Sequence, residues 1–216
     1  MPASRARARI VCSRAMAGST ADTKSSDYAR YLAERRGWKR WLDVQAPYRW
    51  NLRRLRLGFT LDLGCGAGRN LAHLGGNGVG VDHNEHSVAA ARARGLEAYT
   101  SDEFRSTSHA APGRFDALLA AHVLEHMPLA EATALVGAHL AYVKGGGRVV
   151  LITPQEAGFA SDATHVSFTG FAELERVLAA HDLALERRYS FPFPRLAGRV
   201  FRHNEFVVVG RKPLSG

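Results

Sequence analysis

The segment from Phe59 to Arg69 constrains the fold most, because a mostly apolar run passes directly into a glycine-rich turn. The run Phe59–Leu63 precedes Gly64, Gly66 and Gly68, and a helical pattern begins at Arg69. Glycine allows positive φ and lets a ligand approach the backbone closely, while a helix start offers free N–H groups. The segment therefore predicts a strand, a turn and a helix that together can hold a nucleotide-like ligand.

Beyond Gly58, short apolar runs alternate with longer helical patterns, which is typical of α/β proteins. We expect strands at Phe59–Leu63, Gly78–Val81, Glu97–Thr100, Ala117–Ala121, Arg148–Ile152, Leu183–Ser190 and Glu205–Arg211. We expect helices at Arg69–Leu74, Glu85–Arg94, Leu129–Val143 and Phe171–His181. The last two strands have the spacing of a long hairpin. From Asp27 to Leu57 the pattern is helical, and all three tryptophans lie there.

The positive charge of the chain is concentrated at one end. Of 29 Lys and Arg and 20 Asp and Glu, residues 1–60 hold 14 and 4, so residues 61–216 are nearly neutral. The sequence therefore does not require a general anion-binding surface. The 216 residues suffice for one domain, and no apolar run approaches the roughly 18 residues of a membrane span.

The location of the protein is predicted from its first residues and its cysteines. The first 20 residues lack the apolar core of a secretory signal, and two cysteines cannot build a disulfide framework. We therefore expect a soluble, cytoplasmic protein with a basic, flexible leader at residues 1–24. An organelle transit peptide, or initiation at Met16, is the alternative for this leader.

An acidic residue ends the strand that follows the glycine turn. Asp82 lies 18 residues beyond Gly64, at the position where a carboxylate can accept hydrogen bonds from both hydroxyls of a ribose. The glycine spacing departs from the G-x-G-x-x-G pattern that holds a pyrophosphate. The site therefore favours a nucleoside-containing ligand and disfavours NAD.

The stretch Phe115–Met127, which reads FDALLAAHVLEHM, carries a resemblance to a known family. Together with the glycine turn, it resembles the class I S-adenosylmethionine-dependent methyltransferases, and their small-molecule branch most, over about residues 58–211. The resemblance implies a Rossmann-like, doubly wound seven-stranded sheet with an antiparallel last strand.

The same resemblance implies a set of residues that bind S-adenosyl-L-methionine. Gly64 and Gly66 would contact the cofactor, Asp82 the ribose, Asp102 the adenine, and Asp62 the methionine end. Family members often have glycine where Ser101 stands here, so the sequence departs from the family pattern next to the expected adenine contact.

Ligands of an open parallel sheet collect beyond the carboxyl ends of its strands. Three segments can therefore face the reaction, namely His122–Met127, Thr153–Phe168 and Ser190–Asn204. In the first, we expect His122 to line the cofactor and His126 the pocket floor. In the second, His165 is the better candidate for a proton acceptor. In the third, Arg195 follows Phe-Pro-Phe-Pro, which suits a guanidinium held for an anionic acceptor. The alternatives are structural roles for His126 and His165 and a solvated side chain for Arg195.

The sequence thus predicts a methyltransferase that acts on an oxygen or nitrogen nucleophile of a small molecule. A helical cap at residues 25–57 would close over the cofactor, and residues 58–213 would form the cofactor-binding domain. No metal site is expected, and oligomeric state is not predicted. The chain lacks an Asn-Pro-Pro-Tyr-like tetrapeptide, and its absence disfavours a nucleic-acid acceptor. An RNA methyltransferase and a non-catalytic, cofactor-binding partner subunit are the alternatives.

Overall fold

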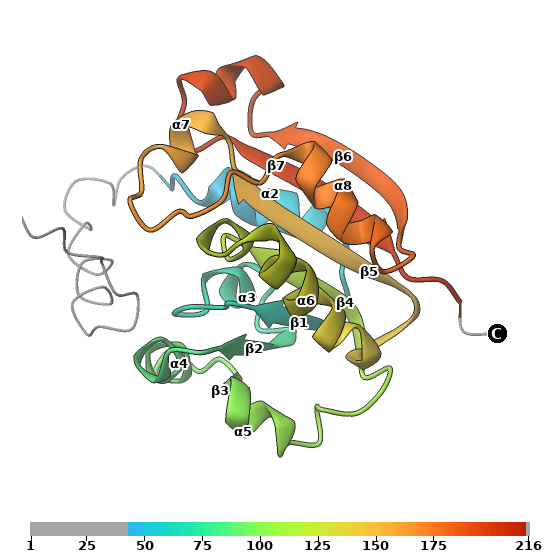
Figure 1. Cartoon of the computed structure of the whole chain (residues 1–216). Helices are drawn as coiled ribbons and strands as arrows, with labels where there is room; N and C mark the ends of the chain where they lie inside the picture. Colours follow the sequence, from blue (N-terminus) through green and yellow to red (C-terminus); the bar gives the residue numbers. More distant parts are fainter. Residues whose placement is uncertain (1–42, 215–216) are drawn as a thin grey trace, which may run out of the picture.

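Seven strands form one sheet with helices on both faces in the computed structural model, which describes residues 43–214 (Figure 1). The strands are β1 (Thr60–Leu63), β2 (Gly78–Asp82), β3 (Ala98–Thr100), β4 (Phe115–Ala121), β5 (Val143–Pro154), β6 (Ala184–Phe191) and β7 (Glu205–Arg211). Their order is β3-β2-β1-β4-β5-β7-β6, and β7 runs antiparallel to both of its neighbours. The predicted Rossmann-like sheet with an antiparallel last strand is therefore confirmed.

Four of the main helices begin at the predicted residue, and the first lies inside the helical stretch expected from Asp27 to Leu57. The main helices are α2 (Ala46–Arg54), α3 (Arg69–His73), α4 (Glu85–Arg92), α6 (Leu129–His139) and α8 (Phe171–Ala179). Two short helices, α5 (Ser101–Arg105) and α7 (Glu156–Phe159), were not predicted. Three 3₁₀ turns were also missed, namely η2 (Leu124–His126), η3 (Leu140–Tyr142) and η4 (Arg195–Arg199). The predicted leader, and residues 25–42 of the predicted cap, lie outside the described residues.

The boundary between α6 and β5 differs from the prediction. The helix ends at His139 and not at Val143, because Val143 is the first residue of β5 and pairs with Phe115 in β4. Both side chains are buried. Val143 thus belongs to the ladder with β4 and Leu140–Tyr142 form η3, although the helical periodicity alone assigns these residues to α6.

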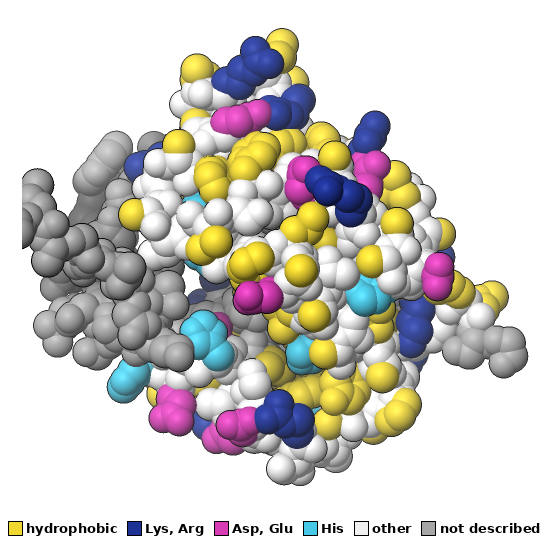
Figure 2. Space-filling view, viewed as in Figure 1, with side chains coloured by type: hydrophobic (Ala, Val, Ile, Leu, Met, Phe, Trp, Pro, Cys, Tyr) yellow, Lys and Arg dark blue, Asp and Glu magenta, His cyan; other side chains and the backbone are white. Residues whose placement is uncertain are grey.

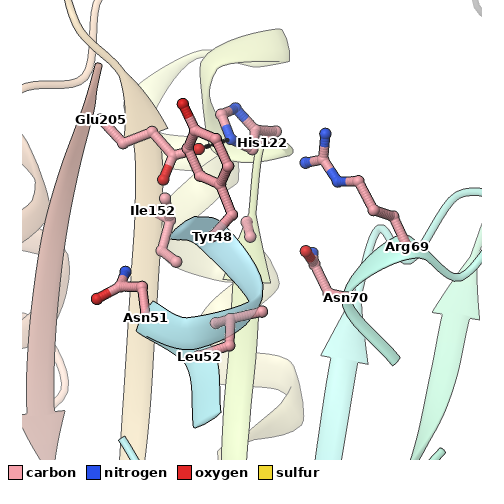
Figure 3. Close-up of a pocket in the computed structure, with 9 residues that line it drawn as sticks. Tyr48, Asn51, Leu52, Arg69, Asn70, His122, Ile152 and Glu205 are labelled. Atoms are coloured by element: carbon pink, nitrogen blue, oxygen red, sulfur yellow. Dashed lines mark hydrogen bonds and ion pairs between the residues drawn. The ribbon is translucent and has the colours of Figure 1, made fainter. Parts of the chain in front are cut away.

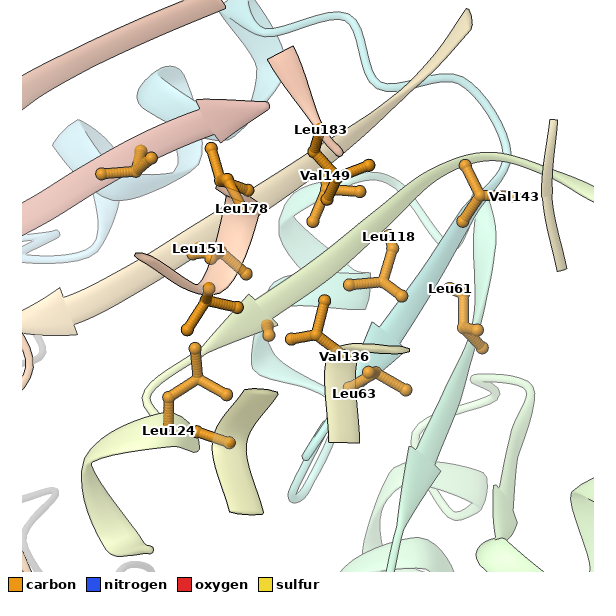
Figure 4. Close-up of a cluster of buried hydrophobic side chains, with 14 of the residues drawn as sticks. Leu61, Leu63, Leu118, Leu124, Val136, Val143, Val149, Leu151, Leu178 and Leu183 are labelled. Carbon is orange, nitrogen blue, oxygen red and sulfur yellow. The ribbon is translucent and has the colours of Figure 1, made fainter. Parts of the chain in front are cut away.

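The central strands are buried on both faces, and successive residues supply two separate cores. Leu118 points to the core under α6 and α8, where it joins Leu61, Val136 and Leu178 (Figure 4). Its neighbour Leu119 points to the opposite core, which includes Leu52 and Leu55 at the end of α2. The described part of the predicted cap is therefore a layer of the fold that packs directly on the sheet.

The parallel strands β1, β2, β4 and β5 all end at one edge of the sheet, and β7 begins there. This edge brings together segments that follow Leu63, Asp82, Ala121 and Pro154, and also the start of β7 at Glu205. No helix of residues 43–214 has the length and apolar character needed to cross a bilayer.

Candidate active site

The glycine turn after β1 leaves room for a ligand at one position. Gly64 and Gly66 both have positive φ, 64° and 54°. A Cβ on Gly64 would lie 2.7 Å from the Val123 side chain, whereas a Cβ on Gly66 would meet no heavy atom within 4 Å. Gly64 is thus required for packing, and Gly66 exposes its backbone to open space where a ligand can approach.

Asp82 is positioned at the end of β2 by the turn itself. Its Oδ2 accepts a hydrogen bond from the Gly66 N–H at 2.8 Å, and its Oδ1 accepts one from the Asn84 N–H at 2.9 Å. The carboxylate is largely buried. These bonds fix its orientation beside the open space at Gly66, as the predicted ribose contact requires.

Asp62 is a fully buried carboxylate whose oxygens form no hydrogen bond of ordinary geometry with the described residues. Burial raises its pKa to about 7, although the positive charge of nearby Arg69 and the nearby Asn70 side chain oppose the rise. A buried acceptor without a partner is costly, and a bound ligand that donates hydrogen bonds can satisfy it. The carboxylate therefore suits an ammonium group, which is the group that the predicted methionine end would bring.

Asp102 lies beyond β3, in the first turn of α5. Its side chain is 88% exposed and pairs with Arg105. The helix begins with a reciprocal cap, in which the Thr100 hydroxyl accepts from the Glu103 N–H and Glu103 accepts from the Thr100 N–H. The spacing Thr-x-x-Glu is a recognised helix start, so this signal could have revealed α5. The adenine contact of Asp102 stays a prediction.

His122 follows β4 with a left-handed backbone conformation, φ 59°, that is uncommon outside glycine. Its Nε2 lies 2.7 Å from Glu205 Oε1, and its Nδ1 lies 3.3 Å from Glu125 Oε1. Burial opposes a charge on the imidazole, but the two carboxylates outweigh it and raise the pKa of His122 to about 9. At neutral pH this residue is therefore a positively charged donor.

Two adjoining hollows flank His122 and Glu205 at the carboxyl edge. The first is lined by residues of α2, α3 and the strands, and Figure 3 shows Tyr48, Arg69 and His122 around it. The second also includes Arg202 and His203 of the connection between β6 and β7. The Tyr48 hydroxyl donates to the His203 carbonyl at 2.6 Å and so joins α2 to that connection.

Arg69, the first residue of α3, lines both hollows. Its side chain forms no hydrogen bond or ion pair with another residue of the described range, and its charge lowers the pKa of Asp62. Tyr48, Arg69 and Glu205 are site residues that the sequence did not predict. The position of Arg69, directly after the last glycine of the turn, was the available signal.

The two predicted catalytic histidines, His126 and His165, come together although they lie in different loops. Their ring centroids are 4.9 Å apart. His126 Nδ1 lies 3.2 Å from the Thr164 carbonyl oxygen, and His165 Nδ1 lies 2.8 Å from that of Phe159. Each Nδ1 is thus placed to donate, which leaves Nε2 with the free lone pair. The structure therefore shows one imidazole pair in place of two separate candidates.

Arg195 has a partner that the sequence analysis did not foresee. Its guanidinium forms a two-pronged ion pair with Glu156 of α7 and stacks over the Phe206 ring at 4.7 Å. The pair joins η4 to α7, so part of the binding capacity of Arg195 is already used within the protein. Its contact with an anionic acceptor stays a prediction.

The connection between β6 and β7 is held by hydrogen bonds of Asn204, next to β7, whereas its middle part around η4 is apolar and basic. At the base, the buried Asn204 side chain donates to Gln155, Ser190 and the Phe193 carbonyl, and accepts from the Phe193 N–H. Farther out, Leu196 and Val200 are 72% and 85% exposed. In Figure 2, hydrophobic and basic atoms stand together at the upper end, where Figure 1 places η4.

Comparison with known proteins assigns the family. The model of a methyltransferase domain matches residues 27–206. The chain belongs to the class I S-adenosylmethionine-dependent methyltransferases. The methyltransferase is 34% identical over 102 residues to a ubiquinone biosynthesis O-methyltransferase of Pseudomonas aeruginosa, which covers 44% of this chain and 43% of the relative. A protein of the same description from Paracidovorax citrulli is 31% identical over 162 residues, or 64% and 65% of the two chains.

Solved structures show the same fold. A methyltransferase from Archaeoglobus fulgidus superimposes with a TM-score of 0.63 at 17% identity, covering 85% of this chain and 99% of the other. The magnesium protoporphyrin IX methyltransferase of Synechocystis gives a TM-score of 0.60 at 16% identity, covering 88% and 95%. The methyltransferase spans less than two thirds of the ubiquinone-biosynthesis relatives described above.

The cofactor of the methyltransferase is S-adenosyl-L-methionine, and the residues at the glycine turn suit it. Gly66 leaves open space, Asp82 offers a carboxylate beside it, and Asp62 and Arg69 offer opposite charges. Such a pair matches the ammonium and carboxylate groups of the methionine end. When bound, the cofactor supplies an activated methyl group on a sulfonium.

Proposed function

We propose that the methyltransferase acts on an oxygen or nitrogen nucleophile of a small, anionic molecule. The observation that carries this proposal is the hollow between Tyr48 and the Arg202–His203 pair, which adjoins Arg69 and His122. It lies at the carboxyl edge of the sheet, next to the cofactor residues. Arg69, Arg202 and the protonated His122 outnumber the one carboxylate, that of Glu205, around this hollow, which favours an acceptor that carries negative charge.

The names of the relatives favour oxygen over nitrogen. The relatives from P. aeruginosa and P. citrulli are both described as O-methyltransferases. Their matches cover part of each chain, so we take from them the kind of atom and leave the acceptor itself to experiment.

Within the proposal, the residues of the chain position the acceptor and take up its proton. Methyl transfer is an in-line displacement, so holding the nucleophile in line supplies much of the rate enhancement. An acceptor O–H or N–H loses one proton as it gains the methyl group. His126 and His165 are the candidate proton acceptors, because His122 is already protonated at neutral pH.

Arg195, in the same connection as Arg202, would add to the positive charge that an acceptor meets. We further propose a cytoplasmic location, the leader at 1–24, the cap at 25–57 and the catalytic domain at 58–213. The alternatives from the sequence, an RNA methyltransferase and a non-catalytic partner subunit, gain no specific support from residues 43–214.

The test is incubation of the purified protein with methyl-labelled S-adenosylmethionine and three sets of acceptors. One set contains phenolic carboxylic acids, one contains neutral phenols and amines, and one contains total RNA. We expect mass spectrometry to find one added methyl group on an oxygen of an anionic small molecule. Label in RNA alone would support the first alternative, and cofactor binding without turnover on any set would support the second.

A further inference from the structure

Glu125 is a second fully buried carboxylate, and the cofactor site does not use it. It lies in η2, between His122 and the imidazole pair, and neither of its oxygens has a hydrogen-bond partner in the described part of the chain. His122 Nδ1 and His165 Nε2 lie 3.3 Å and 4.0 Å from its Oε1, without hydrogen-bond geometry. A buried carboxylate needs donors or cations beside it. His122 is one such neighbour of Oε1, whereas no donor of residues 43–214 reaches Oε2, so Glu125 has the capacity to take a further partner.

The imidazole rings of His126 and His165 lie next to the Glu125 carboxylate. One ligand atom from each of Glu125, His126 and His165 lies within 4.8 Å of the other two. A tetrahedral ion with ligands at about 2.0–2.1 Å holds them roughly 3.4 Å apart. The separations, at most 4.8 Å here, would therefore have to close by up to about 1.4 Å to bring the three into contact with one ion. His165 lies in the loop between α7 and α8, so it can move toward the other two ligands without displacing a helix or a strand.

Backbone contacts orient both imidazoles as metal ligands are oriented. The Phe159 and Thr164 carbonyl oxygens each lie within hydrogen-bond distance of an Nδ1, which fixes the tautomer and leaves Nε2 free. A backbone carbonyl in this position is the usual second contact of a metal-bound histidine. Two imidazoles and one carboxylate favour zinc-like transition metals over magnesium, which prefers oxygen ligands.

We propose that Glu125, His126 and His165 bind one divalent transition-metal ion, for which Zn²⁺ is the probe. Three protein ligands leave at least one coordination position open, as in catalytic zinc sites. The ion would join η2 to the loop that follows α7. It would also change the part played by His126 and His165 in the proposed function, because a metal-bound imidazole holds the ion and cannot accept the proton of the acceptor.

The test is titration calorimetry of Zn²⁺ into the tag-free, metal-stripped full chain. We expect one equivalent to bind, and we expect Glu125→Gln, His126→Gln and His165→Gln each to weaken binding at least about tenfold. His86→Gln, which changes an exposed histidine on α4, is the matched control and should bind as the unaltered protein does. Mg²⁺ should bind far more weakly than Zn²⁺.

A second readout guards against variants that fail to fold. Co²⁺ bound by imidazoles gives visible absorption, which should appear with the unaltered protein and disappear with the near-isosteric Glu125→Gln, after circular dichroism has shown that this variant is folded. The proposal would be overturned if the unaltered protein did not bind one equivalent of Zn²⁺. It would also be overturned if folded Glu125→Gln and His165→Gln bound Zn²⁺ as tightly as the unaltered protein. Neither readout uses methyl transfer, so failure of the proposed function would be recognised separately.

Discussion

Asp62 carries opposite consequences for stability and for cofactor binding. Its pKa in the folded protein, about 7, lies above its ordinary value of 3.8. The free energy of unfolding of the cofactor-free protein therefore falls as the pH rises from about 3.8 to about 7. Above the pKa of Asp62 in the folded protein, this loss of stability is complete. Arg69 of α3 reduces this loss, whereas Asp82 at the end of β2 adds to it.

We predict that Asp62→Asn stabilises the cofactor-free protein at pH 8 by about 1–3 kcal/mol, because it removes a buried charge that lacks a partner. The same change should weaken S-adenosylmethionine binding at least about tenfold, because the amide cannot pair with an ammonium group. Thermal melting at pH 6 and pH 8 and calorimetry measure the two effects. A variant that is less stable at pH 8 and binds the cofactor normally would contradict the assignment.

Asp82 provides the sharper test of the ribose assignment. We predict that Asp82→Asn, which keeps the size of the side chain, weakens cofactor binding by about 1–3 kcal/mol because one acceptor oxygen is lost. Asp102→Asn is the comparison, and its cost should be smaller because the Asp102 side chain is 88% exposed. Titration calorimetry of both variants measures their affinities for S-adenosylmethionine. Equal affinities for the unaltered protein and Asp82→Asn would remove Asp82 from the site.

The connection between β6 and β7 is the element in which acceptor binding and internal pairing compete. Arg195 is shared between the predicted acceptor contact and its ion pair with Glu156. We predict that Arg195→Ala raises the KM for an anionic acceptor about tenfold, roughly 1.4 kcal/mol, and leaves cofactor affinity nearly unchanged. Glu156→Gln removes the internal partner and leaves the guanidinium, so steady-state kinetics should show a smaller rise in KM. Equal rises in the two variants would indicate a purely structural pair.

Asn204 holds the base of this element. We predict that Asn204→Ala lowers the free energy of unfolding by about 2–3 kcal/mol, because it leaves the Phe193 N–H and the Gln155 amide oxygen without their bonds in a buried setting. Asn77→Ala, which changes an exposed residue, is the control and should stay within about 0.5 kcal/mol of the unaltered protein. Urea denaturation measures both, and a similar small loss in the two variants would count against this role.

For the molecule as a whole, the family match begins at residue 27, and the described cores are built from residues 52–209. We therefore predict that a chain starting at Ala21 keeps its melting temperature and its affinity for S-adenosylmethionine. Differential scanning calorimetry and titration calorimetry compare it with the full chain. A clear fall in either quantity would show that residues 1–20 contribute to the folded protein.

Sequence patterns predicted the sheet well and the side-chain pairings poorly. Strands β4 and β5 are found because Ala117–Ala121 and Val149–Ile152 are buried on both faces and form continuous apolar runs, and β1 departs from such a run only at Thr60 and Asp62. The Arg195–Glu156 pair and the Glu125–His126–His165 group depend on how loops from different strands turn toward one another. No local pattern encodes such directions. Val143 shows the same limit, since its place in the ladder overrides the helical periodicity before it.

The tie at Asn204 also bears on how this fold could acquire new specificities. A segment anchored at its base can be lengthened, shortened or replaced at little cost to the rest of the chain, because loop-closure entropy changes slowly with length. Leu196, Arg199 and Val200 lie outside that anchor and are exposed, whereas Arg195 and His203 at the two ends of the stretch contact Glu156 and Tyr48. Mutations at the three exposed positions can accumulate while the strand register stays intact, which makes this stretch the natural target for libraries that seek altered acceptors.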